Sequence, residues 1–481
     1  MNGQPLAPSV DLFVGKHADH RLIAFGLLSR RHHGSQAWRG LKAAIGCLAF
    51  IAGCTADLGS ASASPSRYPT GVTIYDPEAA YKSLIVFSAP DGKTHVIDMQ
   101  GTEIHSWNYE GLPGAIIDPQ LVAGERGHVL LQTEMNKDAP APSILADKTI
   151  AELDWSGKVI WSWGDQAPGG SAAQNHDWAR RANGNTLLLV ARKREVKTLG
   201  SKEVSDQGIY EIDPSGKIVW QWWAGDHLAE FGMSAEGMKY LRHALVENPR
   251  LARWGYLEIN NMQPIGPNKW FDAGDQRFAP DNIIFDSRNA DFVAILDKKT
   301  GKVVWRIGPD FMAGRYNADS STGNRTLPRP LDQLAGQHDA RIIPKGLPGA
   351  GNLLLLDDQG GSGFPPVGLS IYASSRVLEI DPVRQQIVWQ YSAVDSGAPP
   401  WTFFTSFVGS VQRLPNGNTL IDEGMNGRIF QVTPAGKIVW EYIEPYTEKP
   451  SGDSGAIPSR LVYRAQAVPF DWVPADSPAQ K

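Results

Sequence analysis

One short signature recurs six times along the chain, and each copy ends in tryptophan. The signature consists of apolar residues, an Asp or Thr, a short turn that usually carries glycine, and then alternating residues up to the tryptophan. The six terminal residues are Trp107, Trp161, Trp220, Trp305, Trp389 and Trp440. Two strand-like runs joined by such a turn are typical of a β-hairpin. A hairpin repeated at this spacing predicts a repeat fold rather than a series of unrelated domains.

A further strand precedes most copies of the hairpin. Turns of glycine and asparagine open these strands at Asn183-Gly184-Asn185, Gly351-Asn352 and Asn416-Gly417-Asn418. Each unit therefore has room for four strands, and successive tryptophans lie 54, 59, 85, 84 and 51 residues apart. The sequence predicts an all-β fold, a six-bladed β-propeller with insertions in blades four and five. Each tryptophan is expected to pack between neighbouring blades, and residues 227–253, in the long fourth unit, are expected to be helical.

The first part of the chain has the features of an export signal. Basic residues precede an apolar stretch from Ala43 to Gly53, which has the length of a signal-peptide core and is too short to span a bilayer as a helix. The stretch ends at Ile51-Ala52-Gly53-Cys54, which resembles the lipobox of bacterial lipoproteins, where the cysteine is acylated. The alternative is a secretory signal cut after Ala61-Ser62-Ala63. We therefore expect an exported protein of the periplasm or cell envelope, whose predicted membrane contact is a lipid anchor on Cys54.

These features divide the chain into four parts. Residues 1–53 form the leader, 54–80 an exported linker, 81–446 the propeller and 447–481 a C-terminal extension. The net charge is −5, and the leader's excess of Lys and Arg leaves the rest of the chain more acidic still. Because nucleic-acid binders need a basic surface, we set that class aside. No His-Glu-x-x-His pattern, clustered cysteines or Gly-x-Ser-x-Gly elbow occurs, so we predict no metal, no cofactor and no serine hydrolase.

Polar residues gather where the innermost strand of several units would begin. In a propeller these positions meet the central channel, where function collects. Residues 174–178 and 337–341 occupy the position with a histidine each, and residues 258–261 occupy it in the fourth unit, followed by 286–289 at the end of the next strand. Histidine, asparagine and arginine on one axis would bind an oxyanion such as sulfate or phosphate, and an imidazole can be a nucleophile. The alternative is that both histidines are structural and bonded to backbone.

Five longer strings are specific enough to compare with known families. They run from Ile265 to Asp275, Pro280 to Arg288, Gly336 to His338, Lys345 to Asn352 and Gln412 to Leu420. Together they resemble the bacterial arylsulfate sulfotransferase (arylsulfotransferase) family, whose members are six-bladed propellers, and the likeness extends from about Tyr81 to Tyr442. Members move a sulfuryl group from a phenolic sulfate ester to another phenol through a sulfohistidine in a ping-pong cycle, without 3'-phosphoadenylyl sulfate. The resemblance implies a phenolic sulfate donor and a phenol acceptor as partners.

The resemblance also implies roles for five residues. His338 would be the nucleophile, His176 would match the family's histidine before an Asn-Gly-Asn turn, and Arg288 would match the arginine that neutralises the sulfuryl oxygens. Asn260 would match the asparagine of the family's His-x-Asn motif, but the first residue of that motif is Glu258 here. This carboxylate would either repel the sulfate ester or act as a general base or acid, and both roles stay open.

Two functions of other classes compete with the transferase. A non-catalytic propeller lipoprotein that scaffolds envelope complexes would keep its function when His338 is replaced. A quinone-dependent dehydrogenase propeller would share the tryptophan-rich blades, but such propellers usually have about eight blades and the chain carries six signatures. Stoichiometric quinone absorbance in the purified protein would favour that alternative.

Overall fold

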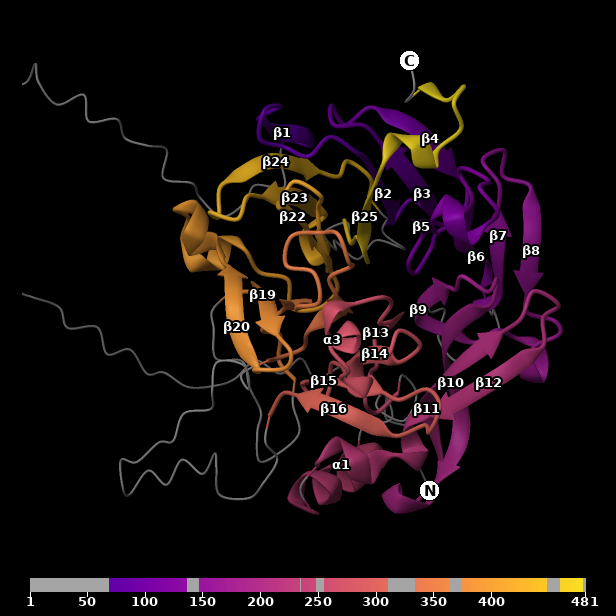
Figure 1. Ribbon diagram of the computed structural model, residues 1–481. Coiled ribbons are helices and arrows are strands. Elements are labelled where there is room, and N and C mark those ends of the chain that lie inside the picture. The colour runs from indigo at the N-terminus through magenta and orange to yellow at the C-terminus, as the bar shows by residue number, and fades with distance from the viewer. Residues whose placement is uncertain are drawn as a thin grey trace, which may run out of the picture. The chain divides into compact units, whose positions relative to one another are not determined.

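Figure 1 shows the computed structural model of the chain. The structure describes residues 69–135, 147–233, 235–247, 255–309, 334–362, 374–447 and 459–478. The chain divides into two units, residues 1–59 and 60–481, and all described residues belong to the second. The predicted leader, its cleavage sites and Cys54 lie outside the described residues.

The second unit is a six-bladed β-propeller built of antiparallel sheets, as the sequence predicts. From the inside outwards, blade 1 contains β25 (Ala465–Val468), β2 (Leu84–Ala89), β3 (Lys93–Ile97) and β4 (Glu103–Trp107); blade 2 contains β5 (Ala115–Ile116), β6 (Val129–Met135), β7 (Asp147–Leu153) and β8 (Val159–Trp163); and blade 3 contains β9 (Gln174–Arg180), β10 (Thr186–Val196), β11 (Ser201–Ile212) and β12 (Ile218–Trp223). Blade 4 contains β13 (Asn261–Pro264), β14 (Ile283–Ser287), β15 (Phe292–Leu296) and β16 (Val303–Ile307); blade 5 contains β17 (His338–Ile342), β18 (Leu353–Asp357), β19 (Arg376–Asp381) and β20 (Gln386–Tyr391); and blade 6 contains β21 (Ser410–Arg413), β22 (Thr419–Glu423), β23 (Arg428–Val432), β24 (Ile438–Ile443) and, outermost, β1 (Gly71–Tyr75).

Strands from both ends of the described chain close the ring. β25 pairs with β2 and is the innermost strand of blade 1, whereas β1 pairs with β24 as a fifth strand of blade 6. Figure 1 shows this as indigo β1 beside yellow-orange β24. β1 lies in the range predicted as a linker and β25 in the range predicted as a C-terminal extension, and each contributes a strand to a blade.

The Asp of the signature forms the hairpin turn with its own side chain. Oδ1 of Asp154 accepts backbone N–H bonds from Ser156 and Lys158 at 2.9 and 3.0 Å, and Asp213 repeats the pattern. The turn glycine, Gly157, has a φ of 83°, which glycine adopts without a Cβ clash. The repeated Asp and Gly are therefore local turn signals that a sequence shows directly.

A tryptophan of each blade donates its indole N–H to the outer hairpin of the next blade. The donors Trp107, Trp163, Trp222, Trp305, Trp389 and Trp440 reach the carbonyl oxygens of Asp154, Gly216, Gly301, Pro382, Pro434 and Met99, at 2.8–3.1 Å. The buried apolar side chains form six large clusters that each combine residues of two neighbouring blades. Packing between blades therefore forms the core, and the indole bond fixes each blade against the next.

In blades 2 and 3 the tryptophan that packs between blades is not the predicted one. Trp163 and Trp222 make the bond to the next blade, two residues after the predicted Trp161 and Trp220. Side chains two residues apart lie on the same face of a strand, so the signature alone does not separate them. Trp161 and Trp220 stay half-buried and face cations, Arg180 and Lys298, whose charged groups lie 5.6 and 5.2 Å from the ring centres.

This assignment predicts different stabilities for two neighbouring substitutions. Trp163→Ala is expected to lower the free energy of unfolding by about 3–5 kcal/mol, because it removes a fully buried ring and leaves the Gly216 carbonyl without its donor. Trp161→Ala removes a half-buried ring and is expected to cost about 1 kcal/mol. Thermal and denaturant unfolding of the two variants would check this order, and the reverse order would contradict it.

Glutamine side chains add a second set of contacts between blades. Gln207, Gln412, Gln431 and Gln466 each accept the N–H and donate to the C=O of one residue in the next blade, namely Ile259, Ala467, Tyr81 and Ile116, at 2.7–3.1 Å. The oxygen and the nitrogen of each side-chain amide both have a hydrogen-bond partner. The two bonds of each glutamine therefore fix the position of one blade relative to the next.

Helices occupy little of the described chain. α1 (Ala235–Glu247) lies between blades 3 and 4 and buries Leu241 and Leu245, one turn apart, while α3 (Lys269–Asp272) lies between β13 and β14. The 3₁₀ turns are η1 (Pro119–Leu121), η2 (Pro168–Gly170), η3 (Lys197–Leu199), η4 (Ala224–Asp226), η5 (Leu228–Phe231), η6 (Gln276–Phe278), η8 (Ala393–Ser396), η9 (Pro400–Thr402), η10 (Gly424–Asn426) and η11 (Phe470–Trp472). The helix predicted within residues 227–253 is confirmed by η5 and α1, residues 248–253 lying outside the described part, and the insertions in blades four and five stay a prediction. Among the described residues, no helix has the length and apolar character to cross a membrane.

Candidate active site

The structure brings the five predicted residues close together beside the innermost strands. His338 is the first residue of β17, His176 lies near the start of β9, and Glu258 and Asn260 lie just before β13. Arg288 follows the last residue of β14, the strand that pairs with β13. Ring closure and blade packing thus place residues together that lie up to about 160 positions apart in the sequence.

The hydrogen bonds of His338 fix where its ring carries the proton. Nδ1 lies 3.0 Å from the carbonyl oxygen of Gly336 and also contacts a carboxylate oxygen of Asp358, while Nε2 lies 3.2 Å from the backbone nitrogen of Val408. Because a carbonyl only accepts and a backbone N–H only donates, the proton is on Nδ1 and the lone pair is on Nε2. Nε2 is therefore the ring atom with an available lone pair.

Asp358 contacts Nδ1 of His338 and thereby fixes the orientation of the imidazole ring. It is fully buried, and its Oδ2 accepts the Nδ1–H whether or not the other oxygen carries a proton. Burial raises the pKa of this carboxyl, followed by smaller opposing effects of Arg288 and Asp357. An acid placed against the far nitrogen of a nucleophilic imidazole holds the tautomer and stabilises positive charge that develops on the ring.

Both histidines are neutral at neutral pH. Burial lowers the pKa of His338 to about 3, with the positive charge of Arg288 as the next cause. Burial likewise lowers the pKa of His176 to about 3, helped by His338, Arg464 and Arg288. Desolvation disfavours the imidazolium, and neighbouring cations add to that effect. The nucleophilic form of His338 is therefore the one that predominates.

A chain of hydrogen bonds also sets the tautomer of His176. The backbone of Ile259 fixes the amide of Gln207, whose nitrogen donates to Oδ1 of Asn175 at 2.8 Å. That oxygen is therefore an acceptor, and it contacts Nδ1 of His176. The proton of His176 is on Nδ1 and its Nε2 keeps a lone pair.

Arg288 is held by partners that a bound sulfate would have to replace. Its Nη1 lies 3.6 Å from Oε2 of Glu258, and its Nη2 donates to the carbonyl oxygen of Ser406 at 3.3 Å. The side chain of Glu258 is 30% exposed, so the pair is partly screened by solvent. Arg288 thus offers a planar donor group close to His338, and Glu258 is its acidic partner in this structure.

Asn260 contacts the backbone of Gln337, the residue that precedes His338. Its Nδ2 donates to the carbonyl oxygen of Gln337 at 3.1 Å, and its own carbonyl oxygen accepts the hydroxyl of Tyr463 at 2.8 Å. The side chain is fully buried, and its Oδ1 has no protein partner among the described residues. No group of three or more His, Cys, Asp or Glu in the described ranges is arranged to hold a metal ion.

One family model matches the chain. The family model for arylsulfotransferase (ASST) matches residues 93–451, which is most of the chain and includes the five predicted channel residues but not Cys54. The chain belongs to the arylsulfotransferase family. Tyr463 and Arg464, which reach the channel from the last part of the chain, lie beyond the residues that match this arylsulfotransferase family model.

The other comparisons add no chemistry to the family. No curated protein matches the chain. Among solved structures, a protein of unknown function from Bacteroides caccae is 11% identical at a TM-score of 0.43, with 81% of this chain and 99% of that chain covered. Virginiamycin B lyase from Staphylococcus aureus is 11% identical at a TM-score of 0.33, with 70% of each chain covered. Quinohemoprotein alcohol dehydrogenase from Comamonas testosteroni is 14% identical at 0.33, covering 77% and 67%. Scores this low carry no argument.

Sequence reasoning missed four groups of this arylsulfotransferase-family site. Asp358 belongs to an Asp-Asp pair that is equally typical of a turn, and the N–H of Val408 has no side-chain signal. Tyr463 and Arg464 lie in the predicted C-terminal extension, and only the pairing of β25 brings them to the channel. These groups depend on contacts between blades, which local patterns do not encode.

Proposed function

We propose that this chain transfers a sulfuryl group from a phenolic sulfate ester to a phenolic acceptor through a sulfohistidine on His338. The tautomer of His338 carries the proposal, because it presents the Nε2 lone pair in a buried site beside the guanidinium of Arg288. Membership of the arylsulfotransferase family supports the same reaction class. The donor is a sulfate ester itself, so the cycle needs no nucleotide sulfate.

The first half-reaction moves the sulfuryl group onto the protein. Nε2 of His338 attacks sulfur, the bond from sulfur to the phenolic oxygen breaks, and the phenolate leaves with the electron pair. Before this step the N–H of Val408 has to release Nε2, because one lone pair cannot serve both partners. The ring then carries positive charge, which the carboxyl of Asp358 at Nδ1 stabilises.

The second half-reaction returns the ring to its starting state. The oxygen of the acceptor phenol attacks sulfur, the bond between sulfur and Nε2 breaks, and the electron pair returns to Nε2. As the bond to sulfur forms, the attacking phenol oxygen becomes strongly acidic and gives its proton to the lone pair on Nε2 of His176. Because the pKa of this ring is lowered to about 3, it then releases the proton to solvent and is neutral again for the next cycle. In the first step negative charge develops on the leaving phenolic oxygen, and the fixed guanidinium of Arg288 stabilises that charge more in the transition state than before it.

Initial velocities with 4-nitrophenyl sulfate and phenol test this function. A ping-pong cycle gives parallel double-reciprocal lines, and the protein alone releases one equivalent of 4-nitrophenol while gaining the mass of one sulfuryl group. Intersecting lines would replace the sulfohistidine with direct transfer in a ternary complex. A wild type that is inert with several phenols would overturn the transferase assignment itself.

Glu258 is expected to compete with the donor rather than to take part in proton transfer. Because its carboxylate occupies Arg288 in the free protein, Glu258→Gln should lower KM for 4-nitrophenyl sulfate about 3- to 10-fold with kcat nearly unchanged. A general acid or base at this position would instead lose kcat and one limb of the pH profile. Asp281→Asn is a matched control, since Asp281 also pairs with an arginine, Arg181, and should leave KM unchanged.

A further inference from the structure

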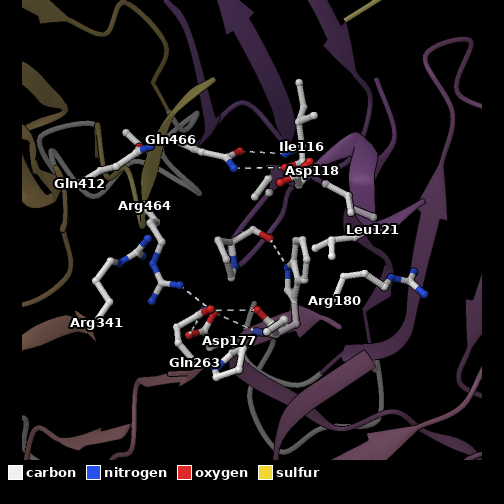
Figure 2. A pocket seen from close by; sticks show the side chains of 18 of the residues that line it. Ile116, Asp118, Leu121, Asp177, Arg180, Gln263, Arg341, Gln412, Arg464 and Gln466 are labelled. Atoms are coloured by element: carbon white, nitrogen blue, oxygen red, sulfur yellow. Dashed lines mark hydrogen bonds and ion pairs between the residues drawn. The ribbon is translucent and has the colours of Figure 1, made fainter. Parts of the chain in front are cut away.

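Arg464 is a buried cation beside the innermost strand of blade 1. It immediately precedes β25, is 8% exposed, and its Nη1 donates to Oδ1 of Asp177 at 2.7 Å. Its Nε lies 3.5 Å from Oδ1 of Asp339, an ion-pair contact to an oxygen that also accepts a hydrogen bond from Nη2 of Arg341. Figure 2 shows the guanidinium of Arg464 directed at Asp177, and both residues line a cavity of about 220 Å³. One side chain from the end of the chain therefore contacts the innermost strands of two other blades.

The two aspartates are the residues that directly follow the two histidines. Asp177 follows His176 on β9, and Asp339 follows His338 on β17. The other carboxylate oxygen of each aspartate accepts a hydrogen bond from the next blade. Oδ2 of Asp177 accepts the backbone N–H of Met262, and Oδ2 of Asp339 accepts the backbone N–H of Val411, both at 2.9 Å. Arg464 thus contacts a carboxylate on each of the two histidine-bearing strands.

The backbone at these strand starts needs such support. His176 has a φ of 71° and Asp339 a φ of 55°, a left-handed region that residues with a Cβ rarely adopt. Conformations of this kind persist where the surrounding contacts fix them. Tyr463 adds one contact, because its ring centre lies 5.9 Å from that of His176 and its hydroxyl donates to the carbonyl oxygen of Asn260.

The positive charge of Arg464 also acts on the two histidine rings and on the buried carboxyls near them. Besides Asp177 and Asp339, the buried carboxyls of Asp286 and Asp422 lie within its electrostatic reach, and burial raises the pKa of both well above its usual range. The other charged or titratable groups that act on the two rings, taken from the elements around them, are Arg288, Glu258, Asp358, Tyr463 and the partner histidine itself. Removing Arg464 would remove one positive charge and leave the carboxylates near the two histidine rings more negative overall.

We propose that Arg464 is a positioning residue, which through Asp177 and Asp339 holds His176 and His338 in place for sulfuryl transfer. The proposal rests on the proposed function, because the placement of the rings matters to the rate only if they perform chemistry. Arg464 lies outside the residues that match the family model, so the family match does not assign it.

Arg464→Leu is expected to lower kcat/KM for 4-nitrophenyl sulfate about tenfold and to change its pH profile. The positive charge favours neutral imidazoles, so its removal favours imidazolium, which cannot attack sulfur. The acid limb of the profile should therefore move to higher pH, by about one unit. Arg464→Lys keeps the charge but not the forked geometry, and should lose rate several-fold with the acid limb unmoved.

Arg413→Leu separates positioning from general destabilisation. Arg413 is also 8% exposed, and its Nη2 pairs with Glu379 at 2.7 Å, away from the histidines. Its removal should lower the melting temperature as Arg464→Leu does while leaving the acid limb unchanged. Because Arg464 lines the cavity in Figure 2, millimolar guanidinium should restore part of the activity of Arg464→Ala but not that of a destabilised Arg413→Ala.

Histidine ring NMR gives a readout that does not require turnover. In ¹⁵N-histidine-labelled protein, the rings of His176 and His338 should titrate at higher pH in Arg464→Leu than in wild type, with the same shift absent in Arg413→Leu. If wild type is inert, the proposed function fails, and this titration still decides whether Arg464 acts on the rings. If wild type is active and a folded Arg464→Leu keeps its rate, acid limb and ring titrations, the positioning role is overturned. Should the leucine variant not fold, Arg464→Lys and the guanidinium rescue carry the same test.

Discussion

His338→Ala is expected to abolish sulfuryl transfer, with kcat for 4-nitrophenyl sulfate and phenol falling about 10⁴-fold or more. The variant lacks the only group placed to attack sulfur in the proposed cycle, and a covalent route that loses its nucleophile falls back to the residual effect of binding and electrostatics. The same variant should release no equivalent of 4-nitrophenol in the absence of acceptor and should gain no sulfuryl mass. Stopped-flow absorbance and intact-protein mass spectrometry measure the two effects.

His128→Ala is the matched control for this experiment. His128 is also a buried histidine whose Nδ1 contacts a carboxylate, Glu152 at 2.7 Å, but it lies in blade 2 away from the site. It should keep kcat within a few-fold while losing similar stability. If His338→Ala keeps the activity or envelope function of the wild type, the non-catalytic scaffold becomes the better account of this propeller.

The parts of the fold that the sequence predicted are those encoded within one hairpin. The Asp and Gly of each turn act on backbone groups two to four residues away, so the repeat could be counted from local signals. The choice between Trp161 and Trp163 could not be made in this way, because both point to one face of β8 and only the neighbouring blade distinguishes them. Local patterns fixed the strands, and contacts between blades selected the packing residue.

The candidate site likewise contains residues that local sequence signals indicate and residues that only contacts in the folded chain reveal. His176, His338 and Arg288 stand at strand ends, where position in the repeat already indicates the channel. Asp358 and Arg464 act through hydrogen bonds to residues that are distant or ambiguous in sequence, and the tautomer of each histidine follows from bonds that only the folded chain forms. The sequence thus named the groups to which the proposal gives chemical roles, and the structure adds the groups that contact and orient them.

Arg288→Leu is expected to lower kcat for sulfuryl transfer about 10²- to 10³-fold, the size of effect seen when one fixed donor to a developing oxyanion is removed. The loss should fall mainly on kcat, because the guanidinium is matched to charge that grows as the bond from sulfur to oxygen breaks. It should also be larger for phenyl sulfate than for 4-nitrophenyl sulfate, since the poorer leaving group develops more charge on oxygen. Arg288→Lys, a point charge without the fork, should recover only part of the rate.

Glu258 has to be controlled in the same series. Removing Arg288 alone leaves the Glu258 carboxylate without its cation beside the incoming sulfate, so Arg288→Leu measures lost stabilisation plus new repulsion. The double variant Arg288→Leu/Glu258→Gln removes the repulsion, and it should regain donor binding while kcat stays low. Arg181→Leu, which deletes a similarly buried arginine paired with Asp281 on another face, should leave both parameters near wild type. A rise in KM with kcat unchanged in Arg288→Leu would mean that this arginine only binds the donor, and stabilisation of the transition state would then have to come from the N–H of Val408 and the remaining cations of the channel.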